Sequence, residues 1–308
     1  MSSEPPIDPR LTEQRNPLTA EIDRLTPLEI VELINAEDHR VPPAVHEERH
    51  AIARALELAE EALSNGGRLI YVGAGTSGRL GVLDASEMPP TYGTDPELVQ
   101  GVIAGGLAAL TRSQEGAEDH PEEGAQEMDR LDVGPADFVL GIAASGSTPF
   151  VHGALERAVE RGAHTGFLLC TTPQPEQYDR YDVVIAPLVG PEVVTGSTRM
   201  KAGTATKLVL NTISTGAMIR LGKVFGNLMV DLRATNLKLQ DRSERILMEM
   251  CELEREQARQ LLARAEGSVK TAIAMYYTGA EPAAASQRLQ EAGGRLGDLL
   301  ERRGPDAA

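Results

Sequence analysis

Three stretches of the sequence combine glycine with serine or threonine, as loops that bind phosphate do. The first closes the apolar run 68–73 and continues to Gly78, the second spans 144–149, and the third spans 190–201. Each precedes a segment that we expect to be helical, and a helix N-terminus offers free N–H groups and a positive dipole end to an anion. Together they predict a phosphate site, whose candidate residues are Gly75, Thr76, Ser77, Ser145, Ser147, Thr148, Ser197, Thr198, Arg199 and Lys201.

These loops also resemble two kinds of nucleotide-binding loop and ordinary tight turns. Gly73, Gly75 and Gly78 match the dinucleotide fingerprint, but the ribose-binding acid of that class is missing from the second apolar run at 98–104. Arg79-Leu80 stands where a P-loop needs lysine and a hydroxyl, which excludes that class. Any single loop also fits a tight turn with a helix cap. Three such loops in one chain favour the phosphate site.

A metal-binding pattern occurs at 46–50, where His-Glu-Glu-Arg-His spells H-E-x-x-H. The helix that we expect at 44–64 has one apolar stripe, and both histidines fall outside it. We therefore interpret the pattern as a solvated helix face and predict no metal and no cofactor. The stripe consists of Ile52, Leu56, Ala59 and Leu63.

Apolar runs alternate with helical patterns in the middle of the chain, which predicts an α/β fold with a doubly wound, mainly five-stranded parallel sheet. Because the carboxyl ends of parallel strands meet at one edge, the three loops should converge on one crevice. The expected strands are 68–73, 98–104, 137–143, 164–170 and 182–188, and a helix is expected at 149–161.

Helical segments are expected both before and after the strands along the chain. A proline-punctuated tail and helices near 20–38 and 44–64 precede it, and the chain from 203 to about 240 shows a long helical pattern without a strand. The last part is helical and charged, with breaks at Gly267 and at 279–282. We expect N-terminal helices at 1–65, an α/β domain with the predicted phosphate site at 66–240 and a small C-terminal helical domain at 241–308.

Composition narrows the class of protein. The chain has 308 residues, 41% of them hydrophobic, and a net charge of -16, which argues against a nucleic-acid or anionic-membrane partner. Two cysteines, Cys170 and Cys251, give no disulfide framework and indicate a reducing compartment. No apolar run approaches the length of a membrane span, and the first residues lack the pattern of a signal peptide. We expect a soluble cytoplasmic protein.

Longer motifs carry a resemblance that spans nearly the whole chain. On these motifs the sequence resembles the N-acetylmuramic acid 6-phosphate etherases, which have the sugar isomerase (SIS) fold. The resemblance implies a cytoplasmic, metal-independent homodimer that cleaves a phosphorylated amino sugar into N-acetylglucosamine 6-phosphate and D-lactate. One position departs from the pattern of this family: the chain has Met88 where cysteine is common in the family. The motifs are Thr12-Glu13, 22–23, 34–38, 71–93, 114–119, 141–151, 190–211 and 222–239.

The resemblance also implies site residues. Glu87 corresponds to the proton donor to the lactate oxygen and Glu118 to the base at C2, while Glu115 and Glu192 would contact the sugar. A regular helix from Ser77 would carry Glu87 roughly 15 Å from the first loop. Both carboxyls then act on one sugar only if that helix is broken or tilted, or if the ligand extends along it. Without the resemblance, Glu87 reads as the end of an exposed helix and Glu118 as one charge of an acidic turn.

Two other functions of the same fold stay open at this point. A sugar-phosphate isomerase would move a proton between C1 and C2 without elimination, and the pair Glu87 and Glu118 favours the etherase over it. A non-enzymatic sugar-phosphate sensor is the second. A DNA-binding regulator should carry a basic helix-turn-helix, for which the first 65 residues are too acidic. A kinase-regulating relative would need a duplicated sugar domain, for which the chain is too short.

Overall fold

The computed structural model describes Asp8 and residues 10–232 and 237–301. The tail expected before Asp8 and parts of the helical segments expected at 203–240 and 241–308 lie outside these residues. The chain forms two compact units. The sheet unit holds Met1–Ala85 and Glu97–Ser214, and the helical unit holds Ser86–Pro96 and Thr215–Ala308. These boundaries differ from those expected at 65 and 240.

The sheet unit contains the predicted parallel sheet. Its strand order is β2-β1-β3-β4-β5, and every neighbouring pair is parallel. Every strand lies within a predicted run, so the fold class is confirmed. The strands are β1 (Leu69–Gly73), β2 (Val99–Ile103), β3 (Phe138–Ile142), β4 (His164–Leu168) and β5 (Val183–Ile185).

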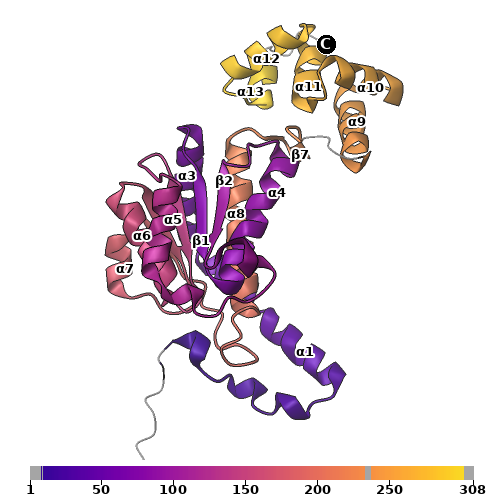
Figure 1. Cartoon of the computed structure of the whole chain (residues 1–308). Coiled ribbons are helices and arrows are strands. Elements are labelled where there is room, and N and C mark those ends of the chain that lie inside the picture. The colour runs from indigo at the N-terminus through magenta and orange to yellow at the C-terminus, as the bar shows by residue number, and fades with distance from the viewer. Residues whose placement is uncertain (1–7, 9, 233–236, 302–308) are drawn as a thin grey trace, which may run out of the picture. The chain divides into compact units, whose positions relative to one another are not determined.

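Helices cover both faces of this sheet. Figure 1 shows α5, α6 and α7 on one face of the sheet. Ile70 and Val72 of β1 belong to the apolar core on this face. Alternate residues point the other way: Tyr71 donates its hydroxyl hydrogen bond to Asp84 of α4, and Asp84 also accepts from Ser214 of α8. The helices are α3 (Arg49–Ser64), α4 (Gly75–Tyr92), α5 (Pro121–Arg130), α6 (Pro149–Glu160), α7 (Pro175–Arg180) and α8 (Lys201–Arg220).

Two glycines let α5 and α6 cross in close contact. A Cβ on Gly124 would lie 2.0 Å from the carbonyl oxygen of Phe150, and a Cβ on Gly153 would lie 1.9 Å from that of Pro121. No side chain fits at such distances, so only glycine permits this crossing. It fixes the short helix η5 (Ala117–Asp119), which carries Glu118, close to the start of α6.

The N-terminal helices differ from the predicted ones at their boundaries. Helix α1 (Pro27–Asp38) begins later than residue 20, because Thr26 and Glu29 form a capping box at its N-terminus. The helix expected at 44–64 is divided at Glu48 into α2 (Val41–Glu47) and α3. The histidines of the H-E-x-x-H pattern therefore lie on two different helices. Shorter 3-10 helices are η1 (Leu11–Glu13), η2 (Pro17–Thr19), η3 (Ile22–Arg24) and η4 (Gly106–Leu110).

The helical unit is a bundle with its own apolar core, which includes Leu247, Ile273 and Leu296. The uninterrupted helical pattern expected after residue 203 was wrong beyond Arg220, because a hairpin of β6 (Val224–Phe225) and β7 (Leu228–Met229) turns at Gly226. The breaks at Gly267 and 279–282 are confirmed. The helices are α9 (Leu237–Cys251), α10 (Arg255–Arg264), α11 (Val269–Thr278), α12 (Pro282–Glu291) and α13 (Leu296–Glu301). Among the described residues, no helix has both the length and the apolar character needed to cross a bilayer.

An ion pair at the amino end of the sheet should control acid stability. The Asp137 side chain is 6% exposed and accepts hydrogen bonds from Arg68 and from the Gly134 N–H. Burial would raise the pKa of Asp137, but the hydrogen bonds from Arg68 and Gly134 outweigh it, so the pKa lies below its usual value of 3.8. A lowered pKa stabilises the fold above the unfolded-state value, and this stabilisation is lost as the pH falls below about 4.

We therefore expect Asp137→Asn to lower the free energy of unfolding by about 2 kcal/mol at pH 7 and by less below pH 4. Urea unfolding across this pH range measures the difference. Glu57→Gln, which breaks the exposed pair with Arg54, is the control and should change little. An Asp137→Asn effect that does not depend on pH would contradict the assignment.

Candidate functional site

The loops after β1 and β3 diverge at the point where the strand order reverses. From β1 the chain moves to β2 on one side and then returns to β3 on the other, and such a point opens a crevice at the carboxyl ends of the strands. A cavity of about 380 Å³, here named the loop cavity, lies there. It is lined by Arg10, Glu13, Ala74, Gly75, Thr76, Ser77, Glu118, Asp119, Ala144, Ser145, Ser147, Thr148, Pro149, Gly196 and Thr198.

The first loop turns tightly from β1 into α4. A Cβ on Gly78 would lie 2.6 Å from Ile103 and 2.7 Å from the carbonyl oxygen of Gly73. Glycine at this position therefore lets α4 start directly above β1 and next to β2. The loop presents the Thr76 and Ser77 side chains and the N-terminal turn of α4 to the cavity.

The second loop is fixed by hydrogen bonds below it. The Gly146 N–H donates to Ala143, and the Gly146 carbonyl pairs with the His152 ring at 2.9 Å. Above this turn the hydroxyls of Ser145 and Ser147 lie 3.0 Å apart. Helix α6 starts at Pro149, so its N-terminal N–H groups lie at the cavity. The loop thus combines hydroxyl donors with a helix dipole, which is a combination that suits a phosphate.

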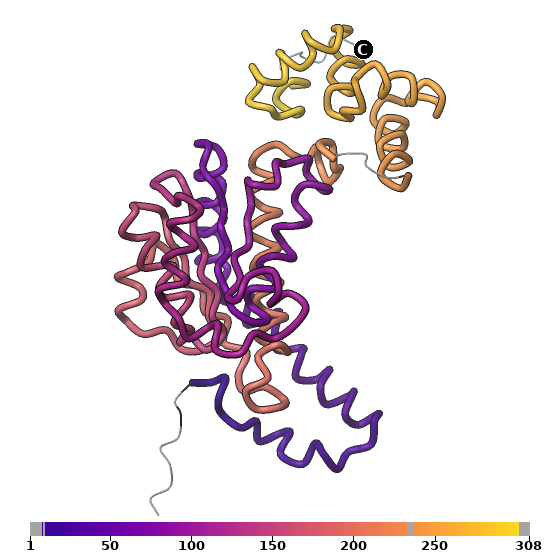
Figure 2. Tube along the Cα trace, in the orientation of Figure 1, coloured from indigo at the N-terminus to yellow at the C-terminus, as the bar shows by residue number. Residues whose placement is uncertain are grey.

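The third loop packs against the start of the chain. The Gly196 N–H donates to the Thr12 carbonyl, and the Thr19 hydroxyl donates to the Val193 carbonyl at 2.8 Å. Figure 2 shows the N-terminal segment, in indigo, running past this loop. Leu11 adds an N–H bond to Thr171. These contacts place residues 10–13 at the mouth of the loop cavity.

A buried cluster of Lys201, Glu37, Asn16 and Glu192 holds this arrangement together. Lys201 is fully buried, and its Nζ donates to Glu37 Oε2 at 2.6 Å. The same oxygen accepts from Asn16 Nδ2 at 2.8 Å. Glu192 accepts from the backbone N–H groups of Lys201 and Ala202 and so caps α8. We name these four residues the buried lysine cluster.

The two carboxyls of this cluster differ in pKa. Burial raises the pKa of Glu192, and the two backbone N–H bonds only partly oppose it. Burial acts in the same direction on Glu37, but hydrogen bonds from Lys201 and Asn16 outweigh it and lower its pKa. Burial and the nearby Glu192 raise the pKa of Cys170 to about 12, so this thiol stays protonated. Glu37 is therefore the ionised partner of Lys201.

The loop cavity contains one cation among the described residues that line it, namely Arg10, together with the acids Glu13, Glu118 and Asp119. The Arg10 Nη1 donates to Ser147 Oγ at 2.7 Å, and the guanidinium also pairs with Asp8. This pairing holds the pKa of Asp8 at about 2. An anion bound at Ser147 would thus meet neutral donors, two helix N-termini and one guanidinium.

Most of the predicted binding residues meet in this cavity, and five do not, of which Glu115 lines a neighbouring cavity instead. Ser197 and Arg199 line none of the cavities described here, and Arg199 is exposed. Glu192 and Lys201 lie inside the protein, because one caps a helix and the other neutralises Glu37. The residues at the cavity are Gly75, Thr76, Ser77, Glu118, Ser145, Ser147, Thr148 and Thr198.

A second cavity, of about 350 Å³, adjoins the first and shares Ala74, Gly75 and Glu118 with it. Here it is named the adjoining cavity. Glu115 lines it, together with Arg79, Ala104, Ala109, Ser113, Gln114, Gly116 and Ala117. Glu118 therefore stands between two compartments.

Glu87 lines neither of these cavities. Helix α4 is continuous from Gly75 to Tyr92, so the broken helix considered from the sequence is not found. Glu87 is exposed and lines a hollow in the helical unit with Lys238 and Arg242.

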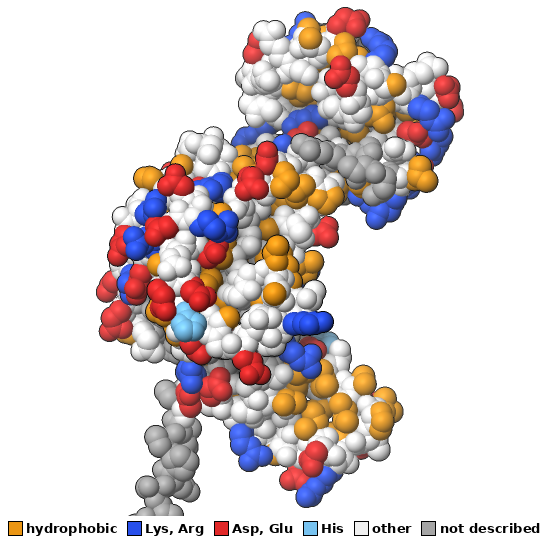
Figure 3. All heavy atoms as spheres, in the orientation of Figure 1, with side chains coloured by type: hydrophobic (Ala, Val, Ile, Leu, Met, Phe, Trp, Pro, Cys, Tyr) orange, Lys and Arg blue, Asp and Glu red, His pale blue; other side chains and the backbone are white. Residues whose placement is uncertain are grey.

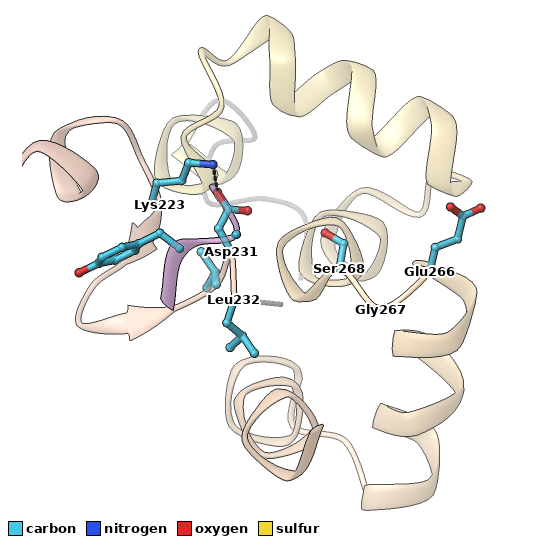
Figure 4. Close-up of a pocket in the computed structure, with 9 residues that line it drawn as sticks. Lys223, Asp231, Leu232, Glu266, Gly267 and Ser268 are labelled. Atoms are coloured by element: carbon cyan, nitrogen blue, oxygen red, sulfur yellow. Dashed lines mark ion pairs between the residues drawn. The ribbon is translucent and has the colours of Figure 1, made fainter. Parts of the chain in front are cut away.

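Another hollow of the helical unit, of about 410 Å³, contains no predicted site residue. Figure 4 shows Lys223 and Asp231 pointing toward each other at its edge, and their ion pair measures 3.3 Å. Asp231 also accepts from Lys270, whose Nζ donates to the Gly222 carbonyl. Lys223 is the one cation among the described residues that line this hollow, and Asp231 and Glu266 are its two acids, so the hollow offers no excess positive charge to a phosphate.

Arg10 and Glu13 were missed as cavity residues. They stand far from the loops in sequence, and no spacing rule connects Arg10 with Ser147, 137 residues away. The one sequence signal was that the resemblance already starts at Thr12-Glu13.

Comparisons with known proteins find relatives over nearly the whole chain. Residues 51–159 match a family model described as the glucokinase regulatory protein N-terminal SIS domain. Proteins named N-acetylmuramic acid 6-phosphate etherase are similar over nearly the whole chain. That of Gloeobacter violaceus is 56% identical over 95% of both chains, and that of Synechococcus elongatus is 55% identical over 93% of both. Among solved structures, a phosphoheptose isomerase from Neisseria gonorrhoeae is 21% identical, with a TM-score of 0.47 over 62% of this chain and 98% of that one.

The buried position of Lys201 leads to a stability prediction. Lys201→Met leaves the buried Glu37 without its ammonium partner and should lower the free energy of unfolding by about 3–5 kcal/mol. The double variant Glu37→Leu/Lys201→Met removes both charges and should recover most of this loss. Chemical denaturation measures all three proteins.

The matched control is Arg199→Met, a loss of one exposed cation two residues away, which should cost under about 0.5 kcal/mol. If Lys201→Met were as stable as the parent protein but bound substrate weakly, Lys201 would be a sugar contact after all.

Proposed function

This chain belongs to the family of N-acetylmuramic acid 6-phosphate etherases, and we propose that its loop cavity binds the phosphorylated amino sugar while Glu118 removes the proton at C2. The observation that carries the binding site is the convergence of two hydroxyl-rich loops, two helix N-termini and Arg10 on one cavity. The enzyme is a carbon–oxygen lyase that cleaves the D-lactyl ether, releasing D-lactate and N-acetylglucosamine 6-phosphate.

The chemistry requires a base and an acid. The ether at C3 is a poor leaving group, but it lies β to the aldehyde that ring opening exposes at C1. The base takes the C2 proton, the C2–C3 double bond forms, and the C3–O bond breaks as the lactate oxygen accepts a proton from the acid. Water then adds to C3 and a proton returns to C2. Two carboxyls in different environments suit these steps.

The C6 phosphate is placed on the second loop. Ser145, Ser147 and Thr148 present hydroxyls at the N-terminus of α6, and Thr76 and Ser77 face them from the first loop. Arg10 adds the positive charge that the predicted Arg199 and Lys201 do not bring to the cavity. Glu118 lies on the same lining, so a sugar whose phosphate is held by these loops extends past its carboxylate.

Glu87 is proposed as the proton donor, supplied by a second copy of the chain. Its side chain is exposed, so a second copy of the chain can approach it. A surface that a second copy would cover is present on α1: Leu28 and Val31 are 66% and 63% exposed. Figure 3 shows apolar side chains gathered over this part of the chain. We therefore propose a homodimer in which the partner's Glu87 completes the site.

For the cell compartment we propose the cytoplasm. Cys170 and Cys251 are free and buried, as suits a reducing environment.

The phosphate assignment is tested by D-lactate release from N-acetylmuramic acid 6-phosphate and from the unphosphorylated sugar. We expect release only from the phosphorylated sugar. Arg10→Gln should raise KM about 10- to 100-fold through the loss of a charged hydrogen bond. Arg15→Gln, an exposed arginine in the same segment, is the control and should leave KM unchanged.

Equal lactate release from both sugars would keep the chemistry and refute the phosphate site. Binding of the sugar phosphate without any release would point instead to an isomerase or a sensor on this fold.

The shared site is tested by mixing subunits. Glu87→Gln and Glu118→Gln should each abolish activity alone. If the partner's Glu87 serves the site, each mixed dimer contains one intact site, and a random mixture should regain about a quarter of the parent activity. If both glutamates act within one subunit, mixing restores nothing, and that result would overturn the proposed arrangement.

A further inference from the structure

The substrate carries two negatively charged groups, and the loop cavity accounts for one of them. The phosphate is on C6, whereas the carboxylate belongs to the lactyl group on O3, at the other side of the sugar. If the phosphate occupies the loops and C2 lies at Glu118, the lactyl group extends beyond Glu118. The adjoining cavity lies there, because it shares Ala74, Gly75 and Glu118 with the loop cavity.

Within the described part of the chain, the adjoining cavity is lined by two acids and one cation, and it differs from the hollow of the helical unit because its cation has no carboxylate partner. Among the described residues that line it, Arg79 is the only cation, and Ser113 and Gln114 add neutral polar side chains. Its acids, Glu115 and Glu118, would repel a carboxylate, so an anion enters only if a cation offsets them.

Arg79 is oriented by one hydrogen bond. It lies on the first turn of α4, and its Nε donates to the Leu110 carbonyl at 3.2 Å. In the part of the chain that the structure describes, its Nη1 and Nη2 have no hydrogen-bond or ion-pair partner. A guanidinium held at Nε keeps two N–H donors for a carboxylate, which it binds in a bidentate manner.

We propose that Arg79 binds the carboxylate of the lactyl group and that the adjoining cavity is the lactyl site of the enzyme. The inference rests on the proposed placement of the phosphate in the loop cavity. It makes Arg79 a specificity-determining residue: the enzyme selects an ether that carries a carboxylate two bonds from the ether oxygen.

The role is compatible with the proposed reaction. When the C3–O bond breaks, its electron pair moves to the lactyl oxygen, which takes the proton from the acid. The carboxylate keeps its charge throughout and departs as the carboxylate of D-lactate. Arg79 neutralises that charge beside Glu118, whose own charge changes as it takes the C2 proton.

The test compares two substrates in two variants. One substrate is N-acetylmuramic acid 6-phosphate, and the other is 3-O-ethyl-N-acetylglucosamine 6-phosphate, which lacks only the carboxylate. The variants are Arg79→Gln and Arg79→Lys, with Arg112→Gln as the control, because Arg112 is exposed and lines neither cavity. The readout is kcat/KM for formation of N-acetylglucosamine 6-phosphate, the product common to both ethers.

We expect Arg79→Gln to lower kcat/KM for the lactyl ether about 10- to 100-fold and to change that for the ethyl ether less than about threefold. Arg79→Lys keeps the charge but loses the bidentate geometry, so it should fall between parent and Arg79→Gln on the lactyl ether alone. Arg112→Gln should change neither.

Equal losses on both ethers would overturn the proposal, because Arg79 would then only support the loop that Leu110 belongs to. Values of kcat/KM that Arg79→Gln leaves unchanged for both ethers would overturn the proposal as well. If Arg79→Gln does not fold, the ratio of kcat/KM for the lactyl ether to kcat/KM for the ethyl ether in Arg79→Lys tests the proposal. A ratio equal to that of the parent protein would overturn it. Failure of the proposed phosphate site is distinguishable, since it would appear in the parent protein as lactate release from the unphosphorylated sugar.

Discussion

A single buried ammonium group, that of Lys201, joins the segments on which the loop cavity depends. It neutralises Glu37 at the end of α1, shares that carboxylate with Asn16, and stands at the first residue of α8. A buried charge is tolerated only when it is paired, so the N-terminal segment and the third loop are constrained to meet. Arg10, Glu13 and Thr198 then line the cavity because their neighbours are held there. The cluster thus stabilises the part of the fold that surrounds the loop cavity.

The strand order supplies the second constraint. The chain leaves β1 in one direction and β3 in the other, so their two loops face each other across a crevice. The glycine crossing of α5 and α6 then brings η5 against the start of α6, which places Glu118 beside the hydroxyls that we assign to the phosphate. A protein with a net charge of -16 can thereby bind an anion locally, because neutral donors and helix dipoles act at short range.

The strands and the convergence of the glycine- and hydroxyl-rich loops could be predicted from the sequence, for a local reason. Apolar runs, glycines and hydroxyls at strand ends are short-range patterns, and parallel topology brings their carboxyl ends together. Arg10 lies outside any such pattern, since its approach to Ser147 depends on tertiary contacts of the N-terminal segment. Lys201 and Glu192 were predicted as ligand contacts because they are charged residues beside a loop, and the structure buries both and gives each a partner inside the protein. The hairpin at 224–229 was missed because strands of two residues leave no periodicity.

The distance of Lys201 from Glu37 along the chain also affects how the protein is made. The two residues are 164 positions apart, so a ribosome that adds 5–20 residues per second needs roughly 8 to 30 s to reach the lysine after the glutamate. Until then Glu37 lacks the ammonium group that pairs with its carboxylate, so burying this carboxylate is unfavourable. We therefore expect the N-terminal segment to dock late, after the sheet has been synthesised, and the nascent chain to complete the loop cavity only when about two thirds of it has been made.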